Sequence, residues 1–364
     1  MTGMLECKLG DVIKFGNGKS RPPSEGGIPI YGGNGILGYS ADANYVGETI
    51  VIGRVGAYCG ATYYEDRPIW VSDNALAAKP KEKNNAKYLF YFLKNLDLNQ
   101  HAQGSSHPLV TQTLLNSIDV EIVEKPDDQK AIAAVLSSLD DKIDLLRRQN
   151  QTLEAMAETL FRQWFVEGAE ADWEEGVISD LVEFNPQRKL VKGTIAPYLD
   201  MASLSTNTFN PEGWRAREFS SGTKFMNGDT LLARITPCLE NGKTAYVTIL
   251  DKDQVGWGST EFIVMRPKGE LHPFFAYALA RNSDFREFAE GCLAGSSGRQ
   301  RVETSHLMSY RIKIPAKDIV RNFNAVAESI APKLHANAAQ IQTLEQLRDS
   351  LLPKLMSGEV RVVV

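Results

Sequence analysis

The sequence contains the same long segment twice, and this repeat limits the fold more than any other feature. Residues 149–165 read QNQTLEAMAETLFRQWF, and residues 340–356, 191 positions later, read QIQTLEQLRDSLLPKLM. A Gly-Ser-Ser triplet precedes each copy at the same offset, at 104–106 and at 295–297. Two related halves predict two related structural units, each made of a divergent globule followed by a better preserved helix.

The length of 364 residues also fits two domains, because a domain usually spans roughly 100 to 200 residues. Short β-rich runs such as TIVI at 49–52 and DTLLA at 229–233 lie between Gly-rich turns, which indicates mixed globules. The expected fold class is α/β (α+β), with two similar mixed domains separated by two long helices that form an antiparallel coiled coil. The predicted parts are a first globule at 1–127, a first long helix at 128–168, a second globule at 169–318, a second long helix at 319–357 and a tail at 358–364.

Apolar residues in both helical segments recur at alternating spacings of four and three, which is the pattern of a coiled-coil seam. One asparagine interrupts each seam, and setting Asn150 against Asn337 in an antiparallel pair fixes the register of the other layers. A slipped register would leave one amide unsatisfied among apolar side chains, so the pair favours this alignment. The predicted seam residues are Leu136, Leu139, Ile143, Leu146, Asn150, Leu153, Leu160, Ile330, Leu334, Asn337, Ile341, Leu344 and Leu351.

The second helical segment is less regular than the first. Pro332 and Pro353 remove backbone donors, so we expect them to kink the helix or to end its regular part. Arg348 falls opposite Leu139 in the seam, and we expect it to turn outward while Leu347 covers the layer.

Several apolar residues lie off the seam, and the sequence leaves two uses for them open. They can dock partner subunits, or they can pack on the globules. These residues are Leu145, Met156, Phe161, Phe165 and Leu347.

Composition excludes several classes of protein. The net charge of −5 argues against nonspecific coating of DNA, so any DNA contact requires local clusters such as Arg215 with Arg217. No apolar run approaches the roughly 18 residues of a membrane span, and no basic flank with an apolar stretch marks the start of the chain for export. The four cysteines form no CxxC pair. We therefore expect a cytoplasmic protein with no membrane contact, no disulfide framework and no zinc site.

No sequence motif for catalysis or cofactor binding fits. Gly18-Lys19-Ser20 resembles the end of a P-loop, but Ile13 stands where its first glycine is required. The segment PDDQK at 126–130 has a nuclease-like spacing, yet carboxylates at the start of a helix are explained by the helix dipole. The five histidines show no metal-ligand spacing. We expect no catalytic residue and no metal ligand in this chain.

Five segments resemble parts of one known family, the specificity subunits of type I restriction-modification systems. Their order along the chain, twice over and with a long helix after each globule, makes the resemblance specific, and it covers nearly the whole chain. The segments are 28–39 (IPIYGGNGILGY), 104–109 (GSSHPL), 228–243 (GDTLLARITPCLENGK), 258–267 (GSTEFIVMRP) and 351–360 (LLPKLMSGEV).

The resemblance implies a non-catalytic subunit with two target recognition domains. Each domain would read one half of a split, asymmetric site in double-stranded DNA, and the helices would set the gap. The subunit would hold two methyltransferase (modification) subunits and, through them, the restriction/translocase subunits. This chain would bind no cofactor, because S-adenosylmethionine, ATP and magnesium would be used by those partners.

Reading bases requires side chains with paired donors or acceptors on loops that approach the groove closely. In the first globule such residues are Lys19, Arg21, Tyr31, Asn34, Arg54, Tyr58, Ser105, Ser106 and His107. In the second globule they are Gln187, Arg188, Lys189, Arg234, Lys243, Ser296, Ser297, Arg299, Gln300 and Arg301. Each also has an alternative use as an ordinary solvated or structural residue.

A second interpretation comes from another class of protein, a structural adaptor built on the coiled coil without DNA sequence specificity. It explains the helices and the acidic charge. It does not explain two duplicated globules whose polar, glycine-rich loops carry arginines.

Overall fold

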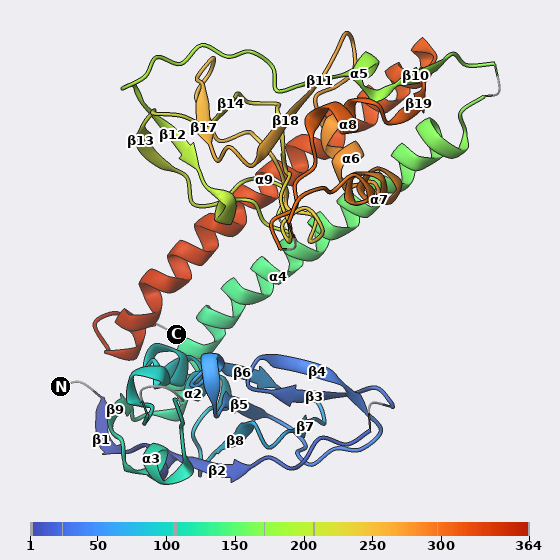
Figure 1. The fold of residues 1–364 in the computed structure, drawn as a ribbon. Coiled ribbons are helices and arrows are strands. Elements are labelled where there is room, and N and C mark those ends of the chain that lie inside the picture. The colour runs from blue at the N-terminus through green and yellow to red at the C-terminus, as the bar shows by residue number, and fades with distance from the viewer. Residues whose placement is uncertain are drawn as a thin grey trace. The chain divides into compact units, whose positions relative to one another are not determined.

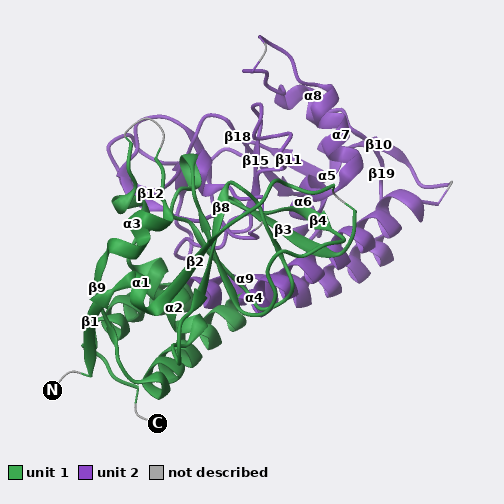
Figure 2. Ribbon diagram, turned by 90° about the horizontal axis from the view of Figure 1, so that it is seen from below, with its two compact units in different colours: residues 1–143, 343–364 green, residues 144–342 purple. Residues whose placement is uncertain are grey.

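The computed structural model of the protein describes residues 3–23, 25–104, 108–170, 172–206, 208–296 and 298–362. The chain divides into two compact units, which Figure 2 shows in green and purple. The first unit comprises residues 1–143 and 343–364, and the second comprises residues 144–342. Both divisions fall inside the long helices α4 (Pro126–Arg162) and α9 (Lys317–Met356) and not at their ends. The expected domains separated helices from globules, but each unit includes a segment of both helices because their apolar faces are buried in its core.

The first unit is built on a four-stranded antiparallel sheet of order β2-β8-β5-β6. Its strands are β2 (Ile13–Asn17), β8 (Ala75–Pro80), β5 (Thr49–Gly53) and β6 (Thr62–Glu65). A smaller sheet of order β4-β3-β7 contains β4 (Gly35–Ser40), β3 (Ile28–Gly32) and β7 (Trp70–Val71), and β1 (Met4–Lys8) pairs with β9 (Asp119–Val123). The short helices are α1 (Leu9–Val12), α2 (Ala86–Asn95) and α3 (Gln112–Ser117).

The second unit contains a matching sheet of order β11-β18-β15-β16. Its strands are β11 (Val182–Phe184), β18 (Phe262–Pro267), β15 (Thr230–Ala233) and β16 (Thr244–Tyr246). The other strands are β10 (Glu175–Val177) with β19 (Arg311–Lys313), and β13 (Arg215–Glu218), β12 (Ile195–Leu199), β17 (Gly256–Gly258) and β14 (Thr223–Phe225) in that order. The helices are α5 (Ile178–Leu181), α6 (Phe274–Arg281), α7 (Ser283–Gly291) and α8 (Thr304–Met308).

The elements follow one another in the same order in both units, as Figure 1 allows the reader to trace. Strand β1, helix α1 and strand β2 correspond to β10, α5 and β11, and the two four-stranded sheets have the same connectivity. Helix α2 corresponds to α6, and each unit's last strand leads into one of the long helices. The predicted fold class is therefore confirmed, and the sequence repeat is a repeat of structure.

Each core contains side chains from both long helices. In the first unit, Leu136 of α4 and Leu355 of α9 belong to the cluster that contains Tyr88 and Leu89 of α2. In the second unit, Phe161 belongs to the corresponding cluster and its ring lies 5.3 Å from that of Phe275 on α6. Removing either helix would therefore open an apolar core in both units.

The off-seam apolar residues divide between the two uses that the sequence left open. Phe161 and Phe165 are buried in the core of the second unit, so they pack on a globule and are not free to dock a partner. Leu145, Met156 and Leu347 stay exposed. Of the five off-seam residues, these three are exposed enough to contact other subunits.

The asparagine register expected from the sequence is present in the second unit. Asn337 Nδ2 donates to Asn150 Oδ1 at 2.8 Å, and both residues are buried. Further along the same pair of helices, the rings of Trp164 and Phe323 meet edge to face, 6.5 Å apart. The two contacts run in opposite directions along the sequence, so the helices are antiparallel here.

The predicted seam residues are all shielded from solvent to some degree. Those that are buried are Leu136, Ile143, Leu146, Asn150, Ile330, Leu334 and Asn337. Those that are half-buried are Leu139, Leu153, Leu160, Ile341, Leu344 and Leu351.

One expectation about α9 was wrong. Arg348 does not turn outward, because its Nη1 donates to Asp140 Oδ1 on α4 at 2.7 Å, and Leu347 is exposed instead of covering the layer. Pro332 does not end the helix, which continues to Met356, three residues beyond Pro353. Pro332 lies on the solvent side, where water can satisfy the carbonyl group that the proline leaves free.

Asn150→Leu should lower the free energy of unfolding by about 1–3 kcal/mol, because it leaves the Asn337 amide unsatisfied in an apolar layer. The double variant Asn150→Leu with Asn337→Leu should regain most of this loss, since neither polar group remains. Chemical denaturation of the four proteins in this cycle measures the coupling. Losses that simply add in the double variant would contradict the paired register.

Candidate nucleic-acid interface

Arg54 directly follows β5 and joins three loops of the first unit through its backbone. Its N–H donates to the carbonyl of Asn74 at 3.0 Å, and its own carbonyl accepts from the N–H of Val110 at 3.0 Å. The preceding Gly53 is packed so closely that a Cβ atom would lie 2.2 Å from the carbonyl oxygen of Tyr58 and 2.9 Å from that of Gly33. The glycine-rich turn, the Arg54 loop and the segment before α3 therefore meet at one corner of the sheet.

Several nominated residues of the first globule are exposed on this unit. Asn34 lies in the glycine-rich turn, Tyr58 ends the Arg54 loop, and Lys19 follows β2, where its N–H donates to the carbonyl of Val71 at 3.0 Å. Arg21 Nη2 donates to the carbonyl of Leu37 at 2.8 Å. The other nominated residues, Ser105, Ser106 and His107, lie outside the described part of the chain.

Tyr31 was nominated for this interface, but it belongs to the core of the first unit. It is only 7% exposed, and its hydroxyl donates to Glu65 Oε2 at 3.3 Å. Burial, together with the charge of Glu65, raises the pKa of Tyr31 to about 12. Strand β3 is buried from Pro29 to Gly32, so the Tyr31 side chain is not available to a DNA groove.

Arg234 occupies the equivalent corner of the second unit, directly after β15. Its N–H donates to the carbonyl of Glu261 at 3.0 Å, and its carbonyl accepts from the N–H of Val302 at 2.9 Å. Lys243 lies beside this corner, because its carbonyl accepts from the N–H of Ala233. The backbone frame around Arg54 is thus repeated around Arg234.

The segment before α8 brings more nominated residues to this second corner. The N–H of Gln300 donates to Thr236 Oγ1 at 3.1 Å, and Arg301 binds Glu261 through its side chain. Arg299 and Ser296 are exposed, whereas Ser297 lies outside the described residues. Arg234, Lys243 and the segment around Arg301 therefore form one cluster.

Arg188 lies elsewhere, near the opposite end of β15. Its Nη2 lies 3.1 Å from Oδ1 of Asp229, a fully buried carboxylate that also binds Arg266 Nε at 2.5 Å. A buried carboxylate needs such partners, so Arg188 has a structural use here. Its neighbours Gln187 and Lys189 are exposed at that end of the strand.

One basic surface was noted in the sequence but not nominated. Strand β13 is exposed at all four residues, and the guanidinium group of Arg217 lies 4.7 Å from the ring centre of Tyr198 and 5.5 Å from that of Trp257. Arg215 also lies over Tyr198, at 5.4 Å. Cations held on aromatic faces in this way are suited to a polyanion. The sequence signal that could have identified Arg215 and Arg217 is the alternation of arginines in RARE at 215–218.

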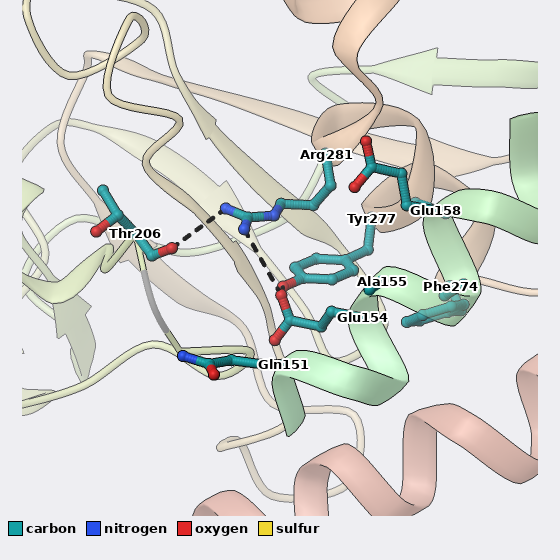
Figure 3. A pocket seen from close by; sticks show the side chains of 10 residues that line it. Gln151, Glu154, Ala155, Glu158, Thr206, Phe274, Tyr277 and Arg281 are labelled. Carbon is teal, nitrogen blue, oxygen red and sulfur yellow. Dashed lines mark hydrogen bonds and ion pairs between the residues drawn. The ribbon is translucent and has the colours of Figure 1, made fainter. Parts of the chain in front are cut away.

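A pocket of about 320 Å³ lies between α4 and α6 in the second unit, as Figure 3 shows. Tyr277 donates its hydroxyl to Glu154 Oε2 at 3.1 Å, and Arg281 Nη2 lies 3.7 Å from the same oxygen. Burial raises the pKa of Glu154, and the attraction of Arg281 only partly offsets this effect. The cluster ties helix α6 of the globule to helix α4.

Among the described residues, no group of three or more His, Cys, Asp or Glu side chains is placed to hold a metal ion. Within the same part of the chain, no helix combines the length and the apolar character that crossing a membrane requires.

Two regions of the chain, residues 1–155 and 170–351, match the family model described as the type I restriction modification DNA specificity domain. The chain belongs to this family. The two matched regions coincide with the two halves of the repeat, and the resemblance seen in the sequence is confirmed. DNA target recognition is the role that the family's description implies.

Curated relatives in the family match most of the chain at low identity. The MjaIX specificity subunit of Methanocaldococcus jannaschii is 24% identical over 318 residues, which cover 78% of this chain and 71% of the relative. The HindI specificity subunit of Haemophilus influenzae is 21% identical over 335 residues, covering 71% and 72%. The crystal structure of a type I S subunit from M. genitalium is 16% identical, with a TM-score of 0.65 over 97% of this chain and 96% of that one. This structure has the same fold.

Glu154→Gln should change how stability depends on pH. Because the raised pKa means that the folded state holds this proton more tightly, the stability contribution is fully present below pH 4.5 and is lost as pH rises through the raised value. The glutamine stays neutral, so the melting temperature of the variant should rise relative to that of the wild type as pH increases from 4.5 through the raised pKa of Glu154. Glu287→Gln, an exposed residue of α7, makes the same charge change as a control. Parallel pH profiles for wild type and Glu154→Gln would be inconsistent with this assignment.

Proposed function

We propose that this chain reads a two-part, asymmetric site in double-stranded DNA as the specificity subunit of a type I restriction-modification complex. The observation that carries the proposal is the repeated corner. The same backbone frame holds Arg54 between Asn74 and Val110 in one unit and Arg234 between Glu261 and Val302 in the other. Two copies of one frame are suited to two half-sites.

The asymmetry of the target follows from the side chains on this frame. Asn74 in the first unit stands where Glu261 stands in the second. Leu109 forms a backbone β-bridge with Val55, and Arg301 forms the equivalent β-bridge with Ile235. An apolar side chain and an arginine present different groups to base edges, so the two domains are expected to prefer different bases.

The chain acts as a scaffold in the cytoplasm and has no catalytic centre of its own. It holds two methyltransferase subunits and, through them, the restriction/translocase subunits. The exposed Leu145, Met156 and Leu347 on the long helices are candidates for these contacts, because each exposes a large apolar side chain. S-adenosylmethionine, ATP and magnesium are used by the partners.

A structural adaptor without sequence specificity remains the competing function. The coiled coil favours it, as do the pairs in which carboxylates neutralise the nominated arginines Arg188 and Arg301. The two functions differ in one measurable property, the preference of the assembled complex for some DNA sequences over others.

The complex of this chain with its modification subunits should select a split motif from a pool of random-sequence duplexes. Replacing residues 1–125 with the equivalent globule of a relative should change one half of the selected motif and leave the other intact, because each globule carries its own corner. Sequencing of the bound duplexes measures both results. A pool recovered without any preference would support the adaptor, and a change in both halves would count against modular reading.

The purified chain alone should not hydrolyse DNA or ATP and should not transfer a methyl group. Activity should appear only after the partner subunits are added. Turnover by the isolated chain, free of partners, would refute the non-catalytic assignment.

A further inference from the structure

Glu261 binds two of the arginines at the second corner at once. Arg301 donates from Nε to Glu261 Oε1 at 2.9 Å and from Nη2 to the same oxygen at 2.7 Å. Arg234 Nε lies 3.4 Å from Glu261 Oε2, which is ion-pair distance. Arg234 Nη2 lies 3.8 Å from Glu303 Oε1. Two arginines and two glutamates therefore form a cluster with no net charge.

The first corner keeps the same backbone frame without this cluster. Asn74 occupies the position of Glu261 and Leu109 that of Arg301. Among the described residues, no ion pair is formed by Arg54, and its Nε atom, like that of Arg234, is buried without a hydrogen-bond partner. None of the undescribed residues has an acidic side chain. The positive charge of Arg54 is thus not balanced at this corner.

We propose that Glu261 holds Arg301 and Arg234 in a fixed orientation for hydrogen bonds to base edges, whereas Arg54 binds a backbone phosphate at the equivalent corner. The inference rests on the proposed function, since both ligands are parts of a DNA duplex. It assigns different roles to the two domains on the basis of two differences, Asn74 against Glu261 and Leu109 against Arg301.

The geometry of Arg301 supports the first half of this proposal. Glu261 occupies the edge of the guanidinium group formed by Nε and Nη2, and Nη1 donates to the carbonyl of Arg299 at 3.4 Å, which leaves one further N–H on Nη1 and one on Nη2 for an outside acceptor. A guanidinium group fixed in this way can pair with two acceptors of one base, as arginine does with guanine. A neutral cluster gains little from releasing counterions, so it is better suited to bases than to phosphates.

The charge of Arg54 supports the second half. A cation without a carboxylate partner can neutralise one phosphate, and each such contact steepens the salt dependence of binding by about one unit of slope. Because phosphates carry no sequence information, this contact strengthens binding to every sequence about equally.

Three variants test the proposal in the complex with modification subunits, with random-sequence duplexes to measure base preference and salt titrations to measure slope. Glu261→Gln should relax the preference in one half of the motif by about 5- to 100-fold, the discrimination that one paired contact provides. Arg54→Ala should weaken binding to all sequences and make the slope shallower by about one. Asn74→Glu should reproduce the shallower slope by giving Arg54 the carboxylate that Arg234 has.

The controls separate folding and general charge from recognition. Glu287→Gln removes one negative charge from an exposed site in the second unit and should leave both halves of the motif unchanged. Asn74 is exposed, so Asn74→Glu keeps the test valid even if Glu261→Gln lowers the melting temperature.

The outcomes distinguish a failure of the proposed function from a failure of this inference. A wild-type complex without any base preference would overturn the proposed function and this inference together. A wild-type complex with a split motif, combined with an unchanged motif in Glu261→Gln or an unchanged slope in Asn74→Glu, would overturn this inference alone. A loss of base preference in Arg54→Ala would also overturn it, because that arginine would then read bases.

Discussion

The structure depends on the burial of both long helices in each of its two cores. Leu136 and Leu355 belong to the core of the first unit, and Phe161 with Phe323 belong to that of the second. A shift of either helix along its axis would move large apolar side chains out of both cores. The buried hydrogen bond between Asn337 and Asn150 also favours this register, because a slipped register would break it. The sheets that carry the Arg54 and Arg234 corners are therefore packed against helices α4 and α9.

The overall architecture was predictable because it depends on patterns that are visible along the sequence. Spacings of three and four identify a helix seam, and the repeat places the second half of the fold once the first is known. The position of Asn150 and Asn337 gave the register for the same reason. Arg348 was misjudged because its partner Asp140 lies on the other helix, and seam periodicity does not reveal a charge pair across helices.

The recognition corners were predictable only in part. Sequence reasoning found Arg54 and Arg234 but could not distinguish their environments. Arg188 and Arg301 look alike along the chain, yet one binds the buried Asp229 and the other binds Glu261, 40 residues away. Such pairings come from tertiary folding and leave no local signal. They also balance positive charge locally, since Arg301 and Arg188 each have a carboxylate partner.

The central claim is that two related domains read two different half-sites. Sequencing of methylated bases in a host that carries the complete system measures this directly, because the methylated positions report the site that the complex reads. The account predicts one asymmetric motif made of two unequal halves with a gap of fixed length. A continuous motif, or two identical halves, would contradict it.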